Sequence, residues 1–187
     1  LFGTWAGLSS FFTKQESTTP PALTSAPSSN VQDVVLFEDD FSDPLSGWPT
    51  GQNSLGGYEY RADGYHIHVD KMNEALLANT NRVDDNASIH VVARPVTEGT
   101  IGYYGLLCRI QDDQNFYYFI IQNNGSYNIG KYKNSVFQPL LSDVWQQSDV
   151  IHQGSQANRL EADCTGNTLR FYANDVLLGE VTDTDFG

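Results

Sequence analysis

Short stretches in which apolar and polar residues alternate recur along the chain from residue 58 onward. A period of two is typical of β-strands that bury one face. These stretches are also rich in β-branched and aromatic residues, which favour strands. They predict strands at 58–61, 65–69, 88–93, 101–110, 116–122, 127–132, 136–141, 159–164, 169–173 and 176–181.

Residues that favour tight turns separate the predicted strands. Asp63-Gly64 lies between the first two, and Asn, Asp and Gly recur at 112–115, 123–125, 165–167 and 174–175. Because Asn, Asp and Gly tolerate the positive φ of short hairpins, consecutive strands are expected to pair antiparallel. The predicted fold class is therefore all-β, an antiparallel β-sandwich.

Two further segments complete the prediction. Residues 34–37 are apolar and are interpreted as the opening strand, and residues 73–80 fit a short helix or a buried strand. The core is expected to contain Trp48, Leu106, Phe119, Ile121, Leu160 and Leu169. If Phe116, Tyr118 and Ile120 are buried instead, the register of that strand shifts by one residue.

The N-terminal region differs from the rest of the chain. Residues 1–12 are apolar and uncharged, and as a helix they would span about 18 Å, against about 30 Å for the hydrocarbon core of a bilayer. They are interpreted as a remnant of a membrane anchor or as a docking peptide. Residues 13–33, rich in Pro, Ser and Thr, predict an extended linker that reaches about 60 Å. Residues 34–187 are assigned to the sandwich domain.

The two cysteines, Cys108 and Cys164, each lie within a predicted strand beside apolar residues of the same parity. This placement favours one cross-strand disulfide over two buried free thiols. Neither cysteine has another cysteine or a histidine at the spacing of metal ligands, so a metal site is less well supported. A disulfide indicates an oxidising compartment.

Composition and charge exclude one class of partner. The 187 residues contain ten Lys and Arg against 23 Asp and Glu, a net charge of −13. Such a surface repels the phosphate backbone, so nucleic-acid binding is excluded. Low charged content at 18% and few methionines are typical of exported all-β proteins.

Acidic and histidine residues are candidates for metal or catalytic chemistry. Asp40 and Asp43 lie in an acidic turn that supplies hard oxygen ligands of the kind that calcium prefers, although such a turn is more often simply solvated. Glu38 and Asp40 resemble the carboxylate pair of laminarinase-like glycosidases only as a near miss. His66 and His68 share one strand face, where zinc ligation competes with simple exposure. No motif of a nucleotide enzyme or serine hydrolase is present.

Aromatic residues provide the remaining candidate chemistry, at 12% of the chain. Sugar rings stack on exposed aromatic side chains, but alternation also turns about half of these rings toward the core. The candidates for carbohydrate contact are Tyr103, Tyr104, Tyr117, Tyr127, Tyr132 and Trp145.

Several strings of residues point to a known family. They are YGLLCR at 104–109, NFYYF at 115–119, NGSYNIGKY at 124–132, FEDDFSD at 37–43 and NRLEADC at 158–164. Together they resemble exported bacterial domains of the concanavalin A-like lectin/glucanase superfamily, related to the 3-keto-disaccharide hydrolase type. The resemblance implies a jelly-roll sandwich and export, but no activity, because it rests on core, turn and cysteine positions. Similar domains continue beyond residue 187 into closing strands, so the sandwich is expected to be incomplete at its C-terminal end.

Three functions fit these observations. The chain is interpreted as a non-catalytic structural or adhesive subunit of a surface filament or membrane-attached complex, with protein contacts through residues 1–33 and membrane contact through residues 1–12. A surface polysaccharide-binding module is nearly as well supported. A glycoside-processing hydrolase follows only from the family analogy. No cofactor is expected other than calcium.

Overall fold

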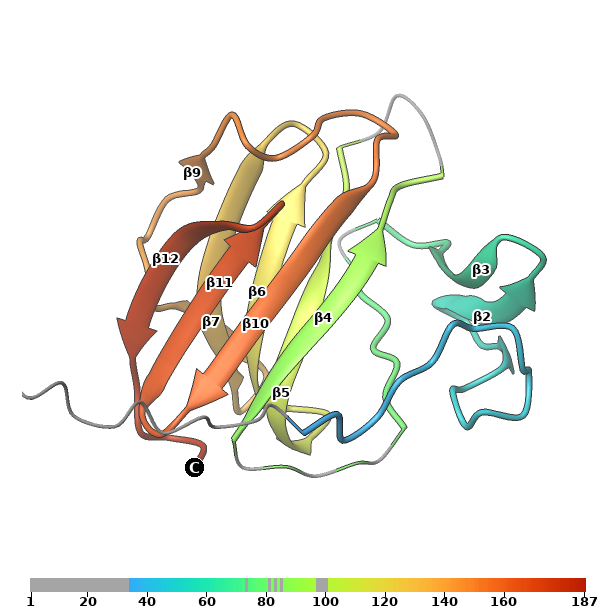
Figure 1. Ribbon diagram of the computed structural model, residues 1–187, viewed down its shortest axis with the longest axis horizontal. Helices are drawn as coiled ribbons and strands as arrows, with labels where there is room; N and C mark the ends of the chain where they lie inside the picture. The colour runs from blue at the N-terminus through green and yellow to red at the C-terminus, as the bar shows by residue number, and fades with distance from the viewer. Residues whose placement is uncertain (1–33, 73, 81, 83, 85, 97–100) are drawn as a thin grey trace, which may run out of the picture.

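The computed structural model describes residues 34–72, 74–80, 82, 84, 86–96 and 101–187, and the segments 1–12 and 13–33 lie outside these residues (Figure 1). The described part contains no helix able to cross a membrane. Its strands are β1 (Gly51–Gln52), β2 (Gly56–Arg61), β3 (Gly64–Val69), β4 (Ala87–Ala93), β5 (Tyr103–Asp112), β6 (Asn115–Gln122), β7 (Ser126–Lys133), β8 (Val136–Pro139), β9 (Gln146–Gln147), β10 (Asn158–Thr165), β11 (Thr168–Ala173) and β12 (Val176–Thr182).

Two antiparallel sheets face each other and form a jelly-roll sandwich, as predicted (Figure 1). One sheet has the order β12-β11-β10-β4. The other has the order β5-β6-β7-β8, and the short strand β9 also pairs with β7. The chain passes from the first sheet to the second between β4 and β5 and returns between β9 and β10.

Short turns form the hairpins of both sheets, including the predicted turn at 174–175 and a further one at 134–135. Asn174 and Asp175 have φ values of 49° and 67° between β11 and β12, and Asn134 and Ser135 have φ values of 50° and 63° between β7 and β8. Such left-handed pairs match the right-handed twist of the strands that they join. The local turn signals therefore account for the hairpin pairs, whereas the pairing of β10 with β4 joins segments far apart in the sequence.

A third, smaller sheet of order β1-β2-β3 lies beside the sandwich (Figure 1). Together with the turn at residues 39–50 it is called the hairpin lobe here. The Tyr58 hydroxyl donates a hydrogen bond to the Leu77 carbonyl over 2.8 Å, and Arg94 pairs with Asp63 over 3.2 Å. These contacts attach the lobe to the chain that leads into β4 and out of it.

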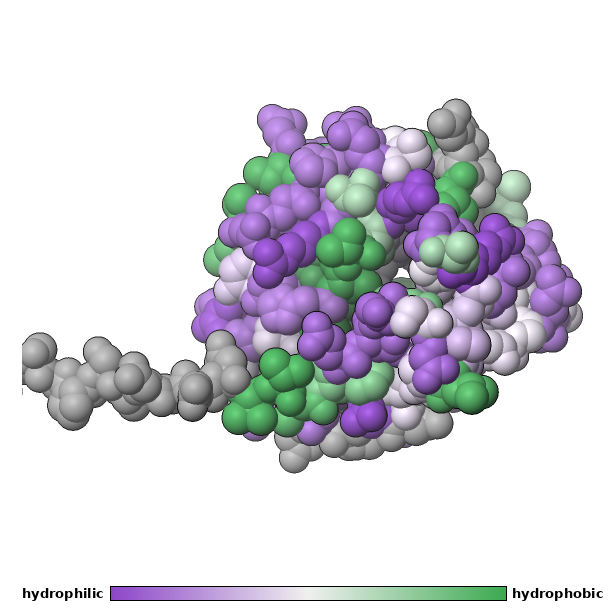
Figure 2. Space-filling model, turned by 45° about the vertical axis from the view of Figure 1, so that its right-hand side comes forward, coloured by the Kyte–Doolittle hydropathy of each residue, from purple (hydrophilic) through white to green (hydrophobic). Residues whose placement is uncertain are grey.

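The prediction of an opening strand at 34–37 is wrong. These residues form no strand, and the exposed fractions of Val34, Val35 and Leu36 are 76%, 74% and 57%. Phe37 instead contacts the Trp48 ring at 6.5 Å, and the Arg82 guanidinium lies 4.1 Å from the Phe37 ring centre. Residues 34–37 are therefore held by side-chain contacts of Phe37 and not by strand hydrogen bonds. Figure 2 shows the apolar surface at this start of the described chain.

The segment predicted as a short helix or buried strand is neither. Residues 74–80 are irregular in the structure, and residues 75–80 are half-buried. Position 73 lies outside the described residues.

The core lies between the two large sheets, and the inward residues of β6 and β11 meet there. The Phe119 and Phe171 ring centres are 5.7 Å apart. Of the residues predicted in the core, five are buried: Leu106, Phe119, Ile121, Leu160 and Leu169. Trp48 is only half-buried, because it packs in the hairpin lobe against Phe41 and Tyr65 at 5.5 and 5.7 Å.

Strand β6 is buried on both faces. Tyr117, Phe119 and Ile121 face the core, while Phe116 and Tyr118 face outward and are only 3% and 5% exposed. The inward register was therefore predicted correctly. Burial of the outward residues was not foreseen, because alternation alone implies one exposed face.

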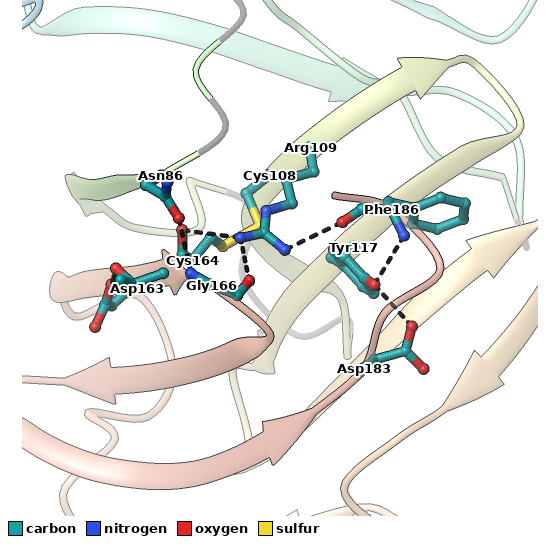
Figure 3. The surroundings of a disulfide bond; sticks show 10 residues. Asn86, Cys108, Arg109, Tyr117, Asp163, Cys164, Gly166, Asp183 and Phe186 are labelled. Atoms are coloured by element: carbon teal, nitrogen blue, oxygen red, sulfur yellow. Dashed lines mark hydrogen bonds between the residues drawn. A yellow bond between two sulfur atoms is a disulfide. The ribbon is translucent and has the colours of Figure 1, made fainter.

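Cys108 and Cys164 form a disulfide with a Cα–Cα distance of 6.8 Å, close to the upper end of the usual range (Figure 3). Cys108 lies on β5 and Cys164 on β10, which belong to different sheets. The bond therefore joins the two layers of the sandwich rather than adjacent strands of one sheet.

Arg109 and the C-terminal segment complete this end of the sandwich (Figure 3). Arg109 has a φ of 50° where the β5–β6 register shifts. Its guanidinium donates hydrogen bonds to the carbonyls of Phe186, Cys164 and Gly166. The Phe186 ring packs on Tyr117 at 5.0 Å, so the last residues cover the core at this end.

A nearly buried ion-pair network holds the same segment. Lys131, on the inward face of β7, lies 2.6 Å from Asp183 and 2.5 Å from Asp185. Burial raises the pKa of Asp183, but hydrogen bonds from Lys131, the Asp185 amide and Tyr117 lower it more, and the resulting pKa lies below its ordinary value. The ionised carboxylate is therefore the form that stabilises the fold.

Removing the disulfide should destabilise the protein without changing its fold. The bond closes a loop with a sequence separation of 56 residues. In the chain-entropy model this stabilises by about 4 kcal/mol. The Cys108→Ser/Cys164→Ser double variant should unfold at correspondingly lower urea. Reductant should lower the midpoint of the native protein and leave that of the double variant unchanged. Equal midpoints for the two proteins would contradict the expectation.

Asp183→Asn should remove part of the acid sensitivity of folding. The pKa of Asp183 is lower in the folded state than in the unfolded chain, so its stabilisation is complete above about pH 4 and is lost as the pH falls through the folded value. The variant should have a free energy of unfolding lower by about 2 kcal/mol at pH 6. The two proteins should converge toward pH 2. Parallel stability curves over this range would refute the assignment.

Candidate functional site

The structure places three of the six candidate aromatic residues in the interior. Tyr117 is fully buried, and its hydroxyl donates to Asp183 over 2.7 Å. The Tyr127 hydroxyl donates to the Leu178 carbonyl, and the Tyr104 hydroxyl accepts a hydrogen bond from Asn158. Tyr117 is therefore closed to a surface ligand, whereas Tyr104 and Tyr127 are half-buried with their rings packed against the core.

The other three candidates do not converge on one site. Tyr103 and Tyr132 share the outer face of the β5-β6-β7-β8 sheet, but they stand opposite Gln122 and Phe116 of β6. Six residues along a strand separate these two positions, which is about 20 Å. Trp145 lies in the loop before β9 and is 40% exposed.

Tyr132 is part of a compact group of rings on that outer face. Phe116 lies 5.2 Å from Tyr132, Tyr132 lies 4.6 Å from Phe137, and Phe137 lies 5.4 Å from Tyr118. These four residues are called the outer-face aromatic cluster here. Phe137 is 53% exposed, whereas Phe116 and Tyr118 are buried. The buried rings therefore support an exposed ring at the edge strand β8.

Gly130 makes room for this cluster. A Cβ atom at residue 130 would lie 2.2 Å from the Tyr118 hydroxyl oxygen and 2.6 Å from the Gln138 carbonyl oxygen. The Tyr118 ring can lie across β7 only because this position has no side chain. Burial raises the pKa of Tyr118 to about 12, so the hydroxyl keeps its proton. No hydrogen-bond partner of this hydroxyl lies among the described residues, although the residue is only 5% exposed.

Asn128 adds a buried polar group to the same face. It is 5% exposed, and its amide nitrogen donates to the Ser142 carbonyl over 3.0 Å. Its Oδ1 atom has no partner in the described chain. An unpaired buried acceptor is uncommon in native proteins.

The acidic turn is occupied by its own backbone. Asp40 accepts a hydrogen bond from the Ser42 amide and Asp43 from the Leu45 amide. Hydrogen bonds from Ser42 lower the pKa of Asp40, whereas a catalytic acid needs a raised pKa. No group of three or more His, Cys, Asp or Glu residues in the described ranges is arranged to hold a metal ion. Calcium at Asp40 and Asp43 stays a prediction.

The two histidines of β3 also have other partners. His66 lies 2.8 Å from Asp63, and His68 lies 3.4 Å from the Gln52 amide nitrogen. Within the described ranges, no set of zinc ligands surrounds them.

Sequence reasoning had selected Tyr132 but had missed its neighbours. Phe137 stands directly opposite Tyr132 in the β7–β8 hairpin. The Asn134-Ser135 turn and the parity of the two strands were sufficient to find this pair. The contribution of Tyr118 depends on Gly130, and no local pattern reveals that dependence.

The fold is an antiparallel jelly-roll β-sandwich. A solved structure with the same architecture is the carbohydrate-binding module CBM66 from Bacillus subtilis, with a TM-score of 0.58 and 15% sequence identity over 75% of this chain and 81% of that chain. No known family model matches the chain, and none of the curated protein sequences matches it.

Gly130→Ala should destabilise the sandwich through the aromatic cluster. The new methyl group would overlap both Tyr118 and the β8 backbone, and overpacking of this kind costs about 1–3 kcal/mol. Gly102→Ala is the matched control, because a Cβ at that position meets no atom within 4 Å. Chemical denaturation of the two variants measures the difference. If the Gly130→Ala and Gly102→Ala variants are equally stable, β7 accommodates the added methyl group without loss of packing, and the expectation is wrong.

Proposed function

We propose that this protein is an exported, non-catalytic β-sandwich of the concanavalin A-like type that binds a surface polysaccharide. The ligand site in this proposal is the outer-face aromatic cluster. The adjoining polar groups are the Tyr118 hydroxyl on β6 and the Asn128 side-chain amide on β7.

The observation that carries the proposal is the exposed Phe137 ring held against Tyr132. Their centres are 4.6 Å apart, and two buried rings support them from below. A rigid aromatic surface loses little conformational entropy when it binds, because its side chains are already ordered. The apolar face of a sugar ring can pack on such a surface while its hydroxyls reach polar neighbours.

Two further observations support this function. The solved structure with the same architecture is described as a carbohydrate-binding module, which makes sugar binding a reasonable use of the fold. The disulfide between the sheets is typical of proteins in oxidising compartments and supports export.

Neither of the other functions predicted from the sequence has a comparable observation behind it. Assembly through residues 1–33 depends on a segment outside the described residues, although the apolar residues 34–36 that adjoin it are exposed. Assembly therefore stays a prediction. A glycosidase would need a carboxylic acid with a raised pKa, and the pKa of Asp40 is lowered.

Truncating the exposed ring should weaken sugar binding and leave the fold intact. A panel of soluble polysaccharides, neutral and acidic, is tested by affinity electrophoresis to find those that retard the native protein. Phe137→Ala should weaken binding about tenfold, because loss of one stacking partner is worth about 1.4 kcal/mol. Since Phe137 is 53% exposed, thermal unfolding should change little.

Tyr172→Ala is the control, since Tyr172 lies on β11 in the opposite sheet, outside the cluster. It should bind as the native protein does. Equal binding by Phe137→Ala, or no retardation by any polysaccharide, would overturn the proposal.

A further inference from the structure

The hairpin lobe contains a groove that the aromatic cluster does not use. Its volume is about 410 Å³, within the usual range of about 300–1,000 Å³ for ligand pockets. It is lined by Pro44, Thr50, Gly51, Gln52, Tyr58, Glu59, Tyr60 and His68. The part of the surface that carries the lobe is mostly hydrophilic or neutral in hydropathy (Figure 2).

The groove exists because β1 is much shorter than β2. Gly51 and Gln52 pair only with Tyr58 and Gly57, so no described strand pairs with Glu59–Arg61 on that side. Alternate residues at an open strand edge present unpaired backbone donors and acceptors. A ligand in the groove therefore meets backbone groups as well as side chains.

Gly57 brings two polar side chains together across the sheet. Gln52, Gly57 and His68 occupy one row of the three strands. A Cβ at residue 57 would lie 2.8 Å from both the Gln52 side chain and the His68 ring. Because glycine occupies this position, the Gln52 amide and the His68 imidazole approach to 3.4 Å above the strand.

Glu59 supplies a carboxylate on the same face. Arg61 pairs with its Oε1 atom and lowers the pKa of Glu59, so the group is ionised. The other carboxylate oxygen has no partner among the described residues. Tyr58 and Tyr60 alternate with Glu59 along β2, so their side chains lie on the other face, where their hydroxyls are hydrogen-bonded to the Leu77 carbonyl and to Ser46.

These groups define the chemistry of the ligand. A carboxylate, an amide and an imidazole can each bind hydroxyl groups, and the open edge of β2 adds backbone donors and acceptors. The ionised Glu59 and the net charge of −13 disfavour uronic acids, sulfates and phosphates. The groove is therefore suited to an uncharged ligand with several hydroxyl groups.

We propose that the groove of the hairpin lobe is a second binding site, and that it takes a neutral mono- or oligosaccharide through Gln52, Glu59 and His68. The site uses none of the residues of the aromatic cluster. With both sites on one chain, the protein engages a polysaccharide at two places, and the second contact benefits from a high effective concentration.

The test is a calorimetric titration of the full chain with short neutral oligosaccharides of glucose, mannose, galactose and fructose. The variants are Gln52→Ala, His68→Ala and Phe137→Ala, with His90→Ala as a control histidine on β4, outside the groove. Gln52→Ala and His68→Ala should each weaken binding at one class of site at least fivefold. Phe137→Ala should leave that class unchanged, and His90→Ala should leave both classes unchanged.

The outcomes separate the two proposals. If Phe137→Ala loses binding while Gln52→Ala and His68→Ala match the native protein, the groove is not a sugar site and the aromatic cluster alone binds. If the reverse holds, the groove binds and the assignment to the cluster fails. Stronger binding of an oligogalacturonate than of every neutral oligosaccharide, lost in His68→Ala, would overturn the choice of a neutral ligand.

Discussion

Burial of β6 on both faces is the constraint on which the rest of the sandwich depends. Its inward residues, including Phe119, require a second sheet to cover them, and Phe171 of β11 meets them there. Its outward residues Phe116 and Tyr118 need cover as well, and rings of β7 and β8 provide it. A strand that fills both faces cannot shift register without exposing one set of large side chains.

Covalent and ionic contacts then hold the layers together at one end of the molecule. The Cys108–Cys164 bond joins the sheets, and Arg109 binds the carbonyls of the C-terminal segment. Lys131 holds the same segment through Asp183 and Asp185. The exposed rings of the outer face rest on a sheet that is tied to its partner at this end, with Phe116 and Tyr118 packed beneath them. Rigidity is the property that a shallow sugar-binding surface needs.

The two proposed sites differ in chemistry because they lie on sheets of different size. The outer-face aromatic cluster rests on a broad sheet, so it offers a firm apolar surface with few polar partners. The groove of the hairpin lobe lies at the edge of a small sheet, where part of the backbone edge is unpaired and polar side chains reach the surface. The first suits stacking and the second suits hydrogen bonding, and polysaccharide recognition uses both.

The sequence by itself predicted ten of the twelve strands, the hairpins between neighbouring ones and the pairing of the two cysteines, but not the two-residue strands β1 and β9. These features depend on a period of two and on turn residues such as Asn174 and Asp175, which act over a few positions. Alternation divides a strand into two faces but does not say how much of each is covered. For this reason Tyr117 and Tyr132 looked equally suitable for sugar contact, although one is fully buried.

Only the tertiary structure decided that the disulfide joins two sheets, that Trp48 belongs to the hairpin lobe, and that residues 34–37 form no strand. It also decided both candidate sites. Gly130 accommodates Tyr118, and Gly57 lets Gln52 meet His68, because neighbouring strands bring these residues within a few ångströms. A missing side chain has a consequence only when another segment fills its space, and that segment is known only once the chain has folded.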